Sequence, residues 1–398
     1  MKSTINGQIA IPATYMRGGT SKGVFFRLCD LPKEAQVAGE YRDRLLRRVI
    51  GSPDHYGKQI DGMGGATSST SKVVIISKSN SVDHDIDYLF GQVSIDEPLV
   101  DWSGNCGNLS AAVGPFALHS GLISKERIPS NGVVKVRVWQ ANINKTIVVH
   151  VPVVDGHVQE SGNFQLDGVT FPSAEIPIDF MSPTINESGI FPTGRIVDEL
   201  IVPNVGHFNA TFISSGIPTV FIESSAVGYE GTELQDDINR DESALEQLEL
   251  IRAYGAIKMG LISSLEEAQV RQHTPKLVLV SKPKAYRSSC GKWFEKHEIN
   301  FNARALSMGK LHHAMMGTAA VAIASAACVP GTIVHQVFNG EHQGPITFGH
   351  PSGSLTVGAE VIKESDKWEV EKVTMSRSAR RLMAGVVFIP DNFMSKLS

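Results

Sequence analysis

The first residue that could do chemistry is Lys72, which ends a loop rich in glycine and hydroxyl side chains. The loop reads DGMGGATSSTSK over residues 61–72, and a β-branched run follows it. A lysine at such a junction can act as a base, because neighbouring dipoles and desolvation lower the pKa of its amine. The structural alternative is a solvated lysine at the end of a strand. The preceding loop, rather than the lysine itself, favours the catalytic interpretation.

A second candidate is Cys106, which lies in the turn SGNCGN (103–108) before an apolar stretch. The glycines allow a tight turn whose N–H groups point outward, and a helix N-terminus attracts carboxylates. The same position favours the reactive thiolate form of a cysteine. A buried structural cysteine is the alternative, but the glycine and asparagine neighbours indicate a reactive thiol beside a turn that binds carboxylates.

The chain repeats itself once, which indicates two similar lobes. Three segments recur in the same order: residues 13–26 resemble 210–222, residues 70–78 resemble 274–282, and residues 106–114 resemble 316–324. Their offsets of 197, 204 and 210 residues are too long for a solenoid. We therefore expect a first lobe at 1–185, with Lys72 and Cys106, and a second at 190–380. Residues 381–398 are expected to return to the first lobe.

The repeat also predicts where the two lobes face each other. A turn at residues 315–318 precedes the second apolar helix, so both helix N-termini should point into one cleft and bind several carboxylates. Met316 stands where Cys106 would recur, and a thioether cannot exchange a proton. A symmetric mechanism with two thiols is thereby excluded. Lys276 repeats Lys72, but it follows a proline instead of a glycine-rich loop, so Lys72 is the favoured base.

Within each lobe the pattern is of strands around one helix. Residues 72–77, 91–95, 133–139 and 145–151 are β-branched and partly alternating, as strands are. The helix expected from Leu109 to about Ser120 is apolar on nearly all sides, so a sheet should surround it. Residues 33–50 and 236–254 should lie outside. The predicted fold class is α+β, with two pseudo-symmetric lobes, each a mostly antiparallel sheet or barrel wrapped around a central apolar helix.

Further anion ligands are expected in other glycine-rich turns. Residues 16–23 (MRGGTSKG) lack the GxxxxGK[ST] spacing of a phosphate loop, so nucleotide binding is rejected, although Arg17 could still grip a carboxylate. Residues 349–354 form a similar loop. The expected substrate-binding residues are Arg17, Thr20, Ser21, Gly64, Gly65, Ser103, Asn105, Gly107, Asn108, Lys310, His313, Met316, Gly317, Thr318, Ser352, Gly353 and Arg377.

Composition excludes several classes of protein. The net charge is −4 and the basic residues are scattered, so nucleic acid is not an expected partner. The four cysteines form no CxxC pair, and their scarcity fits a reducing cytoplasm. His312 and His313 have no carboxylate partner in sequence, so no metal is expected. Residues 314–334 carry no charge, but they are rich in small residues and read as a buried helix to about Cys328 instead of a membrane span. The first residues lack the apolar run of a signal peptide.

Taken together, MRGGTSKGVFF, DGMGGATSSTSK, DWSGNCGN, RALSMGKLHHAMMGTAA and GHPSG resemble the PrpF family of 2-methylaconitate cis-trans isomerases, over nearly the whole chain. The resemblance implies the diaminopimelate epimerase-like fold, with the active site between two lobes. It implies that Lys72 is the principal base, that Cys106 lies beside it, and that no cofactor is needed. Related epimerases use two cysteines, and Met316 in place of the second makes epimerisation of amino acids an unexpected activity.

The resemblance also implies a substrate and a pathway. A trans-aconitate-type tricarboxylate would lose a proton next to its alkene, rotate as a dienolate and regain the proton, within propionate breakdown by the methylcitrate cycle. The alternative reaction is that of a tautomerase on 4-oxalomesaconate or methylitaconate, in which the proton returns to another carbon. An alternative of another class is a non-catalytic accessory protein for an iron–sulfur methylcitrate dehydratase of the aconitase type. A homodimer is the expected assembly.

Overall fold

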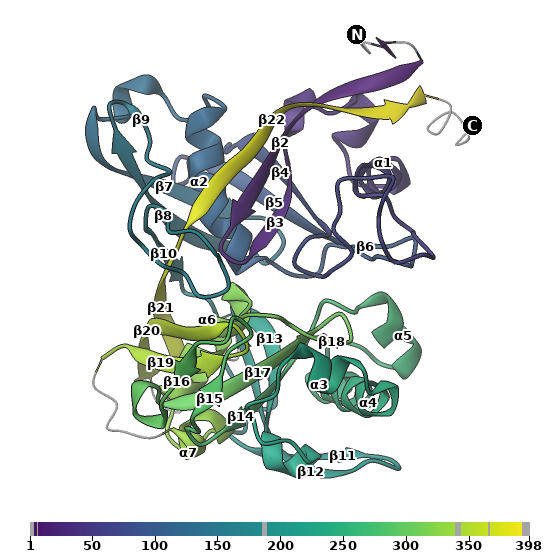
Figure 1. Cartoon of the computed structure of the whole chain (residues 1–398), viewed down its shortest axis with the longest axis vertical. Coiled ribbons are helices and arrows are strands. Elements are labelled where there is room, and N and C mark those ends of the chain that lie inside the picture. Colours follow the sequence, from purple (N-terminus) through teal and green to yellow (C-terminus); the bar gives the residue numbers. More distant parts are fainter. Residues whose placement is uncertain (1–3, 6, 185–188, 339–343, 365–366, 392–398) are drawn as a thin grey trace.

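The molecule consists of two lobes stacked along its long axis (Figure 1). The computed structural model describes residues 4–5, 7–184, 189–338, 344–364 and 367–391. One sheet of 20 strands runs through both lobes. None of the described helices combines the length and the apolar character that a membrane crossing requires.

The first lobe is a sheet in the order β22-β2-β3-β4-β5-β7-β8-β10. All pairs are antiparallel except β3–β4 and β5–β7, which are parallel. The short strands β1, β6 and β9 pair antiparallel with β2, β5 and β8, respectively. The strands are β1 Thr4–Ile5, β2 Gln8–Gly18, β3 Ser21–Arg27, β4 Lys72–Lys78, β5 Ile86–Val93, β6 Val100–Asp101, β7 Asn131–Gln140, β8 Lys145–Val154, β9 His157–Val158, β10 Ile176–Met181 and β22 Ala379–Pro390.

The second lobe repeats this order as β11-β12-β13-β14-β17-β19-β20-β21. Its parallel pairs, β13–β14 and β17–β19, stand at the same two places, and β10 pairs with β21 to join the lobes. The internal repeat is therefore confirmed as a structural one. The strands are β11 Asp198–Val202, β12 Gly206–Ser215, β13 Ile217–Glu223, β14 Lys276–Ser281, β15 Tyr286–Arg287, β16 Trp293–Phe294, β17 Phe301–Ser307, β18 Lys310–Leu311, β19 Ile346–His350, β20 Gly353–Glu364 and β21 Lys367–Arg377.

In each lobe the sheet surrounds one buried helix, as expected from the apolar sequences of the two helices. These are α2 (Gly107–His119) and α6 (Gly317–Ala327), and all of α6 and nearly all of α2 are buried. Both helices belong to one continuous apolar core that spans the two lobes. The other helices, which lie towards the outside, are α1 Glu40–Ile50, α3 Gln235–Asn239, α4 Glu242–Lys258, α5 Leu265–Val270 and α7 Ile333–Val337. Short 3-10 turns occur at Leu28–Asp30, Lys33–Ala35, Lys125–Arg127, Ser224–Val227 and Lys296–Glu298.

Three expected elements have different limits in the structure. The amphipathic segment 236–254 is two helices, α3 and α4, because the Asp241 side chain accepts a hydrogen bond from the Ala244 N–H and starts a new helix. The segment 33–50 begins with the 3-10 turn Lys33–Ala35 and is α-helical only from Glu40, since Gly39 has a φ of 144° before α1. The strand expected at 91–95 is β5, which ends at Val93 and begins earlier, where Ile86 pairs with Lys78.

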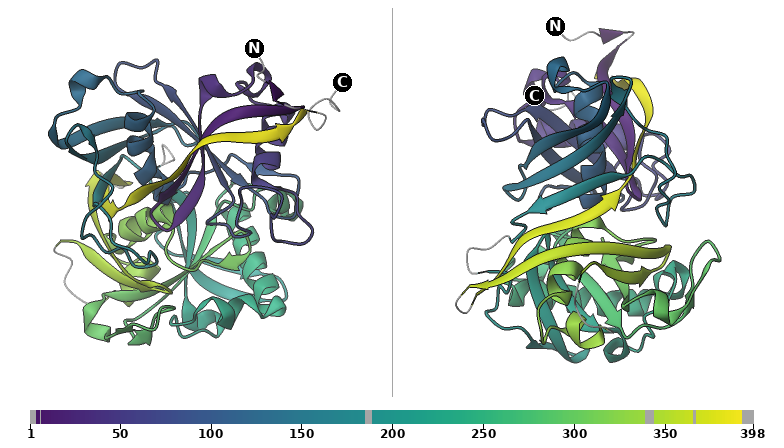
Figure 2. Two further views of the ribbon diagram at one scale, coloured as in Figure 1. Left: turned by 45° about the horizontal axis from the view of Figure 1, so that its top comes forward. Right: turned by 90° about the vertical axis from the view of Figure 1, so that its left-hand side faces the viewer.

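The C-terminal strand β22 crosses from the second lobe to the first. It pairs with β2 along the whole length from Gln8 to Gly18, so the two ends of the described chain lie close together (Figures 1 and 2). Residues 392–398 of the predicted returning segment lie outside the described residues. The expected boundary between the lobes, at 185–190, follows β10, and residues 185–188 also lie outside them.

Candidate active site

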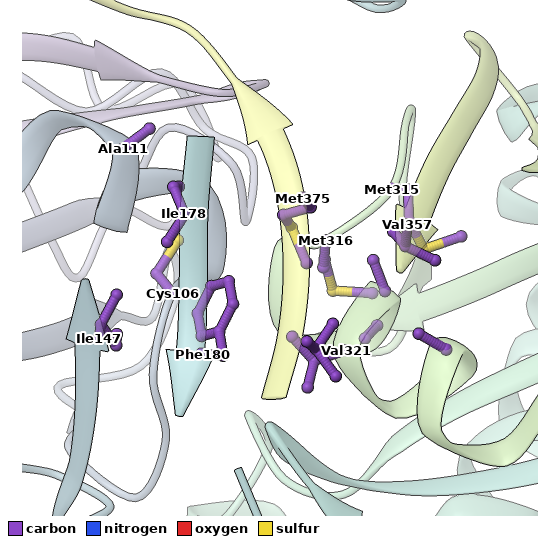
Figure 3. Close-up of a cluster of buried hydrophobic side chains, with 14 of the residues drawn as sticks. Cys106, Ala111, Ile147, Ile178, Phe180, Met315, Met316, Val321, Val357 and Met375 are labelled. Carbon is purple, nitrogen blue, oxygen red and sulfur yellow. The ribbon is translucent and has the colours of Figure 1, made fainter. Parts of the chain in front are cut away.

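The N-termini of the two buried helices meet between the lobes. Cys106 is the N-cap of α2, where its sulfur accepts a hydrogen bond from the Leu109 N–H at 3.5 Å, and Met316 is the N-cap of α6. A Cβ atom added to Gly107 would lie 2.6 Å from the carbonyl carbon of Gly317, and one added to Gly317 would lie 2.5 Å from that of Gly107. The two backbones therefore touch, and only glycine allows this approach. Figure 3 shows Cys106 on the side of the first lobe and Met316 on the side of the second.

A small cavity of about 10 Å³ lies at this junction. Both lobes contribute to its wall, and in the described structure no carboxylate side chain lines it. Amines, imidazoles and amides surround it together with the positive ends of two helix dipoles, which makes it a site for an anion. The lining residues are Ser21, Ser68, Lys72, Asn105, Cys106, Gly107, Asn108, His273, Lys276, Ser307, His312, Met316, Gly317 and Thr318.

Lys72 is the first residue of β4, and its side chain is buried at 5% exposure. It faces Gln92 on the neighbouring strand β5, and its Nζ donates a hydrogen bond to Gln92 Oε1 at 2.5 Å. The Gln92 amide nitrogen is itself fixed, because it donates to the Ser71 carbonyl. Burial lowers the pKa of Lys72, while the neighbouring Cys106 opposes that shift. A buried amine with a lowered pKa is what a general base at neutral pH requires.

Lys276, the counterpart of Lys72 on β14, reaches the same cavity and is only 1% exposed. Its Nζ donates to Ser307 Oγ at 2.8 Å and lies 3.1 Å from His273 Nδ1. Burial, followed by the charge of Lys72, holds the pKa of Lys276 well below its usual value. From its sequence context Lys276 ranks below Lys72, and it is not among the expected site residues. The signal that could have identified it was the repeat itself, which places the two lysines at equivalent positions.

His312 and His313 follow β18, and their rings stack with centroids 4.6 Å apart. His312 lines the cavity, where burial and then His313 hold its pKa well below the usual value. His313 lies 3.4 Å from Ser69 Oγ through its Nδ1. Among the described residues, no three His, Cys, Asp or Glu side chains lie together as metal ligands would. Burial also lowers the pKa of His313, so both imidazoles are neutral at neutral pH beside the cavities that they line.

Asn108, in the first turn of α2, and Arg377, the last residue of β21, form a buried hydrogen-bonded pair. Arg377 Nε donates to Asn108 Oδ1 at 3.0 Å, and Asn108 Nδ2 donates to Thr20 Oγ1 at 3.0 Å. Burial lowers the pKa of Arg377 to about 10, so its guanidinium still carries a charge at neutral pH. Asn105, at 1% exposure, has neither a donor nor an acceptor for its side-chain amide within the described part of the chain. A buried amide without a partner is costly, and Asn105 lines the cavity, so its side chain is available to a bound ligand.

Two larger hollows flank the small cavity, and they meet at Ser69 and His313. One, of about 690 Å³, is lined by Arg17, Thr20 and Ser21, among others. The other, of about 550 Å³, is lined by Lys310 and His312, among others. Arg17 is not free to turn, because its guanidinium donates to the Gly19 and Ser378 carbonyls, Ser378 Oγ and Ser173 Oγ.

The remaining five residues of the expected site do not line the small cavity. Ser103 Oγ lies 3.0 Å from Thr274 Oγ1 and so joins the two lobes, and Ser352 Oγ donates to the His313 carbonyl. A Cβ on Gly353 would collide with Asp167, one on Gly64 with Gln59, and one on Gly65 with Thr70. These five residues shape the surrounding loops.

Comparisons with known proteins agree with this architecture. Residues 8–390 match the family model described as PrpF protein. The chain is 62% identical over 387 residues to the 2-methyl-aconitate isomerase of Shewanella oneidensis and 61% identical to that of Cupriavidus necator, with 96% of this chain and 98% of each relative covered. A 4-oxalomesaconate tautomerase of Pseudomonas putida is 35% identical, with 96% of this chain and 97% of that protein covered.

Solved structures show the same fold. The crystal structure of a methylitaconate-delta-isomerase superposes with a TM-score of 0.73 at 33% identity and covers 98% of both chains. A probable proline racemase of Agrobacterium radiobacter, 10% identical, superposes with a TM-score of 0.56 over 95% of this chain and 92% of that one. The expected diaminopimelate epimerase-like fold is therefore confirmed. Because the PrpF family model matches residues 8–390 and two relatives are more than 60% identical, this chain belongs to the PrpF family.

Proposed function

We propose that this chain is a cofactor-independent isomerase that converts 2-methyl-trans-aconitate to 2-methyl-cis-aconitate and also accepts trans-aconitate. The observation that carries the proposal is the buried amine of Lys72 in a cavity lined by two helix N-termini and by no described carboxylate. Such a site favours a polyanion with an acidic C–H bond. The names of the relatives that are 61–62% identical support this choice of substrate.

The geometry supports a mechanism with one base. The neutral amine of Lys72 takes a proton from the substrate methylene: the C–H bond breaks, an N–H bond forms, and the electron pair enters a dienolate. The former double bond gains single-bond character and can rotate. Lys72 then returns the proton to the same carbon. During these steps the helix N-termini and the Asn105 amide, which has no other described partner, stabilise charge on the carboxylates.

The substrate must widen this cavity when it binds. A volume of about 10 Å³ is about what one water molecule needs, and a tricarboxylate is many times larger. The two flanking hollows, of about 690 and 550 Å³, adjoin the cavity through Ser21 and through Ser307 and His312 respectively. Entry therefore requires movement at the junction between the lobes. When the lobes close again over the bound substrate, they exclude water from the dienolate.

Two alternative functions follow from the same site. If the proton returned to a different carbon, the enzyme would be a tautomerase or double-bond isomerase, and the relatives named for methylitaconate and 4-oxalomesaconate support that variant. A non-catalytic accessory role beside an iron–sulfur dehydratase would not explain why the amines of Lys72 and Lys276 are buried in the cavity. We place the reaction in the cytoplasm, in propionate breakdown by the methylcitrate cycle, with a homodimer as the assembly.

Separate incubations of the purified protein with trans-aconitate and with 2-methyl-trans-aconitate in D₂O test the proposal. We expect cis-aconitate to appear in the NMR spectrum, with deuterium at the methylene carbon and, for 2-methyl-trans-aconitate, the alkene between its original carbons. Migration of the alkene as the main product would favour the tautomerase. An absence of both product and exchange with either substrate would contradict the isomerase and favour the accessory role.

The activity of the wild-type protein should rise with pH. Only the neutral amine of Lys72 can accept a proton, so kcat/KM increases as Lys72 loses its own proton. Because burial lowers the pKa of Lys72, the midpoint of this rise should lie below the usual lysine value of about 10.4. A pH profile of kcat/KM measures it. A rate that instead falls steadily from about pH 6 to about pH 9 would be inconsistent with an amine base.

A further inference from the structure

The two lobes present a pair of equivalent amines to the same cavity. Lys72 begins β4, which runs parallel to β3, and Lys276 begins β14, which runs parallel to the equivalent strand β13. Each amine donates to a neutral side chain on the next strand, Lys72 to Gln92 on β5 and Lys276 to Ser307 on β17. The repeat that placed a methionine opposite Cys106 has therefore kept a matching group opposite Lys72.

The hydrogen bonds around Lys276 determine how many of its N–H groups remain for a ligand in the cavity. His273 Nε2 lies 3.3 Å from the Asn105 carbonyl, which can only accept, so this nitrogen carries the imidazole proton. His273 Nδ1 is then an acceptor, and Lys276 donates to it as well as to Ser307. An ammonium has three N–H groups, so the protonated form of Lys276 keeps one for the cavity.

The reaction intermediate has a matching symmetry. Removal of a methylene proton from an aconitate leaves an allylic anion with a carboxylate-bearing carbon at each end. Lys72, which took the proton, lies at one end. The charge that moves to the other end needs a donor there, and Lys276 lines the same cavity from the other lobe.

Resting on the proposed isomerase function, we propose that Lys276 is a second catalytic amine, which donates a hydrogen bond to the substrate carboxylate remote from Lys72. In the cis-trans reaction Lys276 keeps its proton, and no bond to its nitrogen breaks. Were Lys276 to transfer that proton, its N–H bond would break, a C–H bond would form at the remote carbon, and the alkene would migrate. The same residue would then perform the tautomerase chemistry.

The surroundings favour one charged and one neutral amine during turnover. Two buried like charges close together disfavour a state in which both are protonated, so the pair shares its protons. The bound tricarboxylate supplies negative charge that restores one ammonium, and the other amine stays available as the base. The titratable and charged groups that act on Lys276 are Lys72, Cys106, Asp101, Arg252, His273 and His312.

Replacement of Lys276 by methionine or by glutamine tests the inference. We expect kcat for trans-aconitate to fall about 100-fold, as for the loss of one donor to a developing anion. The rising limb of the pH profile should also move to higher pH, because Lys72 loses a like-charged neighbour that disfavours its protonation. Lys282→Met, which removes an exposed amine near the end of the same strand, is the matched control and should behave as wild type.

Thermal unfolding accompanies the kinetics. Methionine is close to lysine in length and removes the cost of burying a charge, so Lys276→Met should unfold at or above the wild-type temperature. A folded variant with kcat within about threefold of wild type would overturn the role of Lys276. A loss of kcat without the shift of the pH limb would assign it a structural role and overturn it equally. An inactive wild-type protein would instead refute the proposed function.

Discussion

Replacement of Lys72 by methionine is expected to lower kcat for the conversion of trans-aconitate to cis-aconitate by at least about 10³-fold, within the range of general base catalysis. Methionine keeps the length and the apolar stem of the side chain, so β4 and its neighbours should pack as before. The loss is that of the amine that donates to Gln92 Oε1. Deuterium exchange into the substrate methylene should disappear with the product.

The matched control is Lys78→Met, at the exposed end of the same strand, which should leave both exchange and isomerisation unchanged. Exchange that survived in Lys72→Met while the product vanished would show that another group removes the proton. Lys276 and Cys106 are the neighbours that could do so, and the double variant Lys72→Met/Lys276→Met would distinguish them.

Gly107→Ala and Gly317→Ala are expected to destabilise the protein and to inactivate it. Each new Cβ would lie 2.5–2.6 Å from a backbone carbon of the opposite helix terminus, and neither backbone can rotate away as a side chain would. The cost should be about 1–3 kcal/mol, as for other overpacked sites. The two lobes would also move apart at the reacting centre, where a displacement of about 1 Å can lower the rate about 10²-fold.

Gly358→Ala provides the control for this pair. Gly358 lies in β20, and a Cβ added there would have open space around it. The free energy of unfolding should stay unchanged or rise by about 0.5–1 kcal/mol, because alanine has less freedom to lose on folding than glycine. Denaturant unfolding together with trans-aconitate assays would show the difference. Wild-type stability and activity in Gly107→Ala would mean that the helix termini do not approach as closely as described.

The sequence by itself determined the architecture, the family and much of the wall of the cavity. The repeat predicted two lobes, and the pairing of β3 with β4 and of β13 with β14 reproduces it strand by strand. Apolar stretches without a polar face predicted two enclosed helices, because only a surrounding sheet can keep such a helix from water. Turns that contain glycine predicted both helix N-termini, because glycine allows a tight turn whose N–H groups point outward.

The tertiary structure alone decided which charged groups share the cavity. Sequence ranked Lys276 by the proline before it, but the burial of an amine depends on strands and loops far away along the chain. Arg17 is a second example: its sequence predicted a carboxylate ligand, and only the structure shows that its two Nη atoms also donate to backbone and serine oxygens. Hydrogen-bond partners and desolvation arise from long-range packing, which local sequence patterns do not encode.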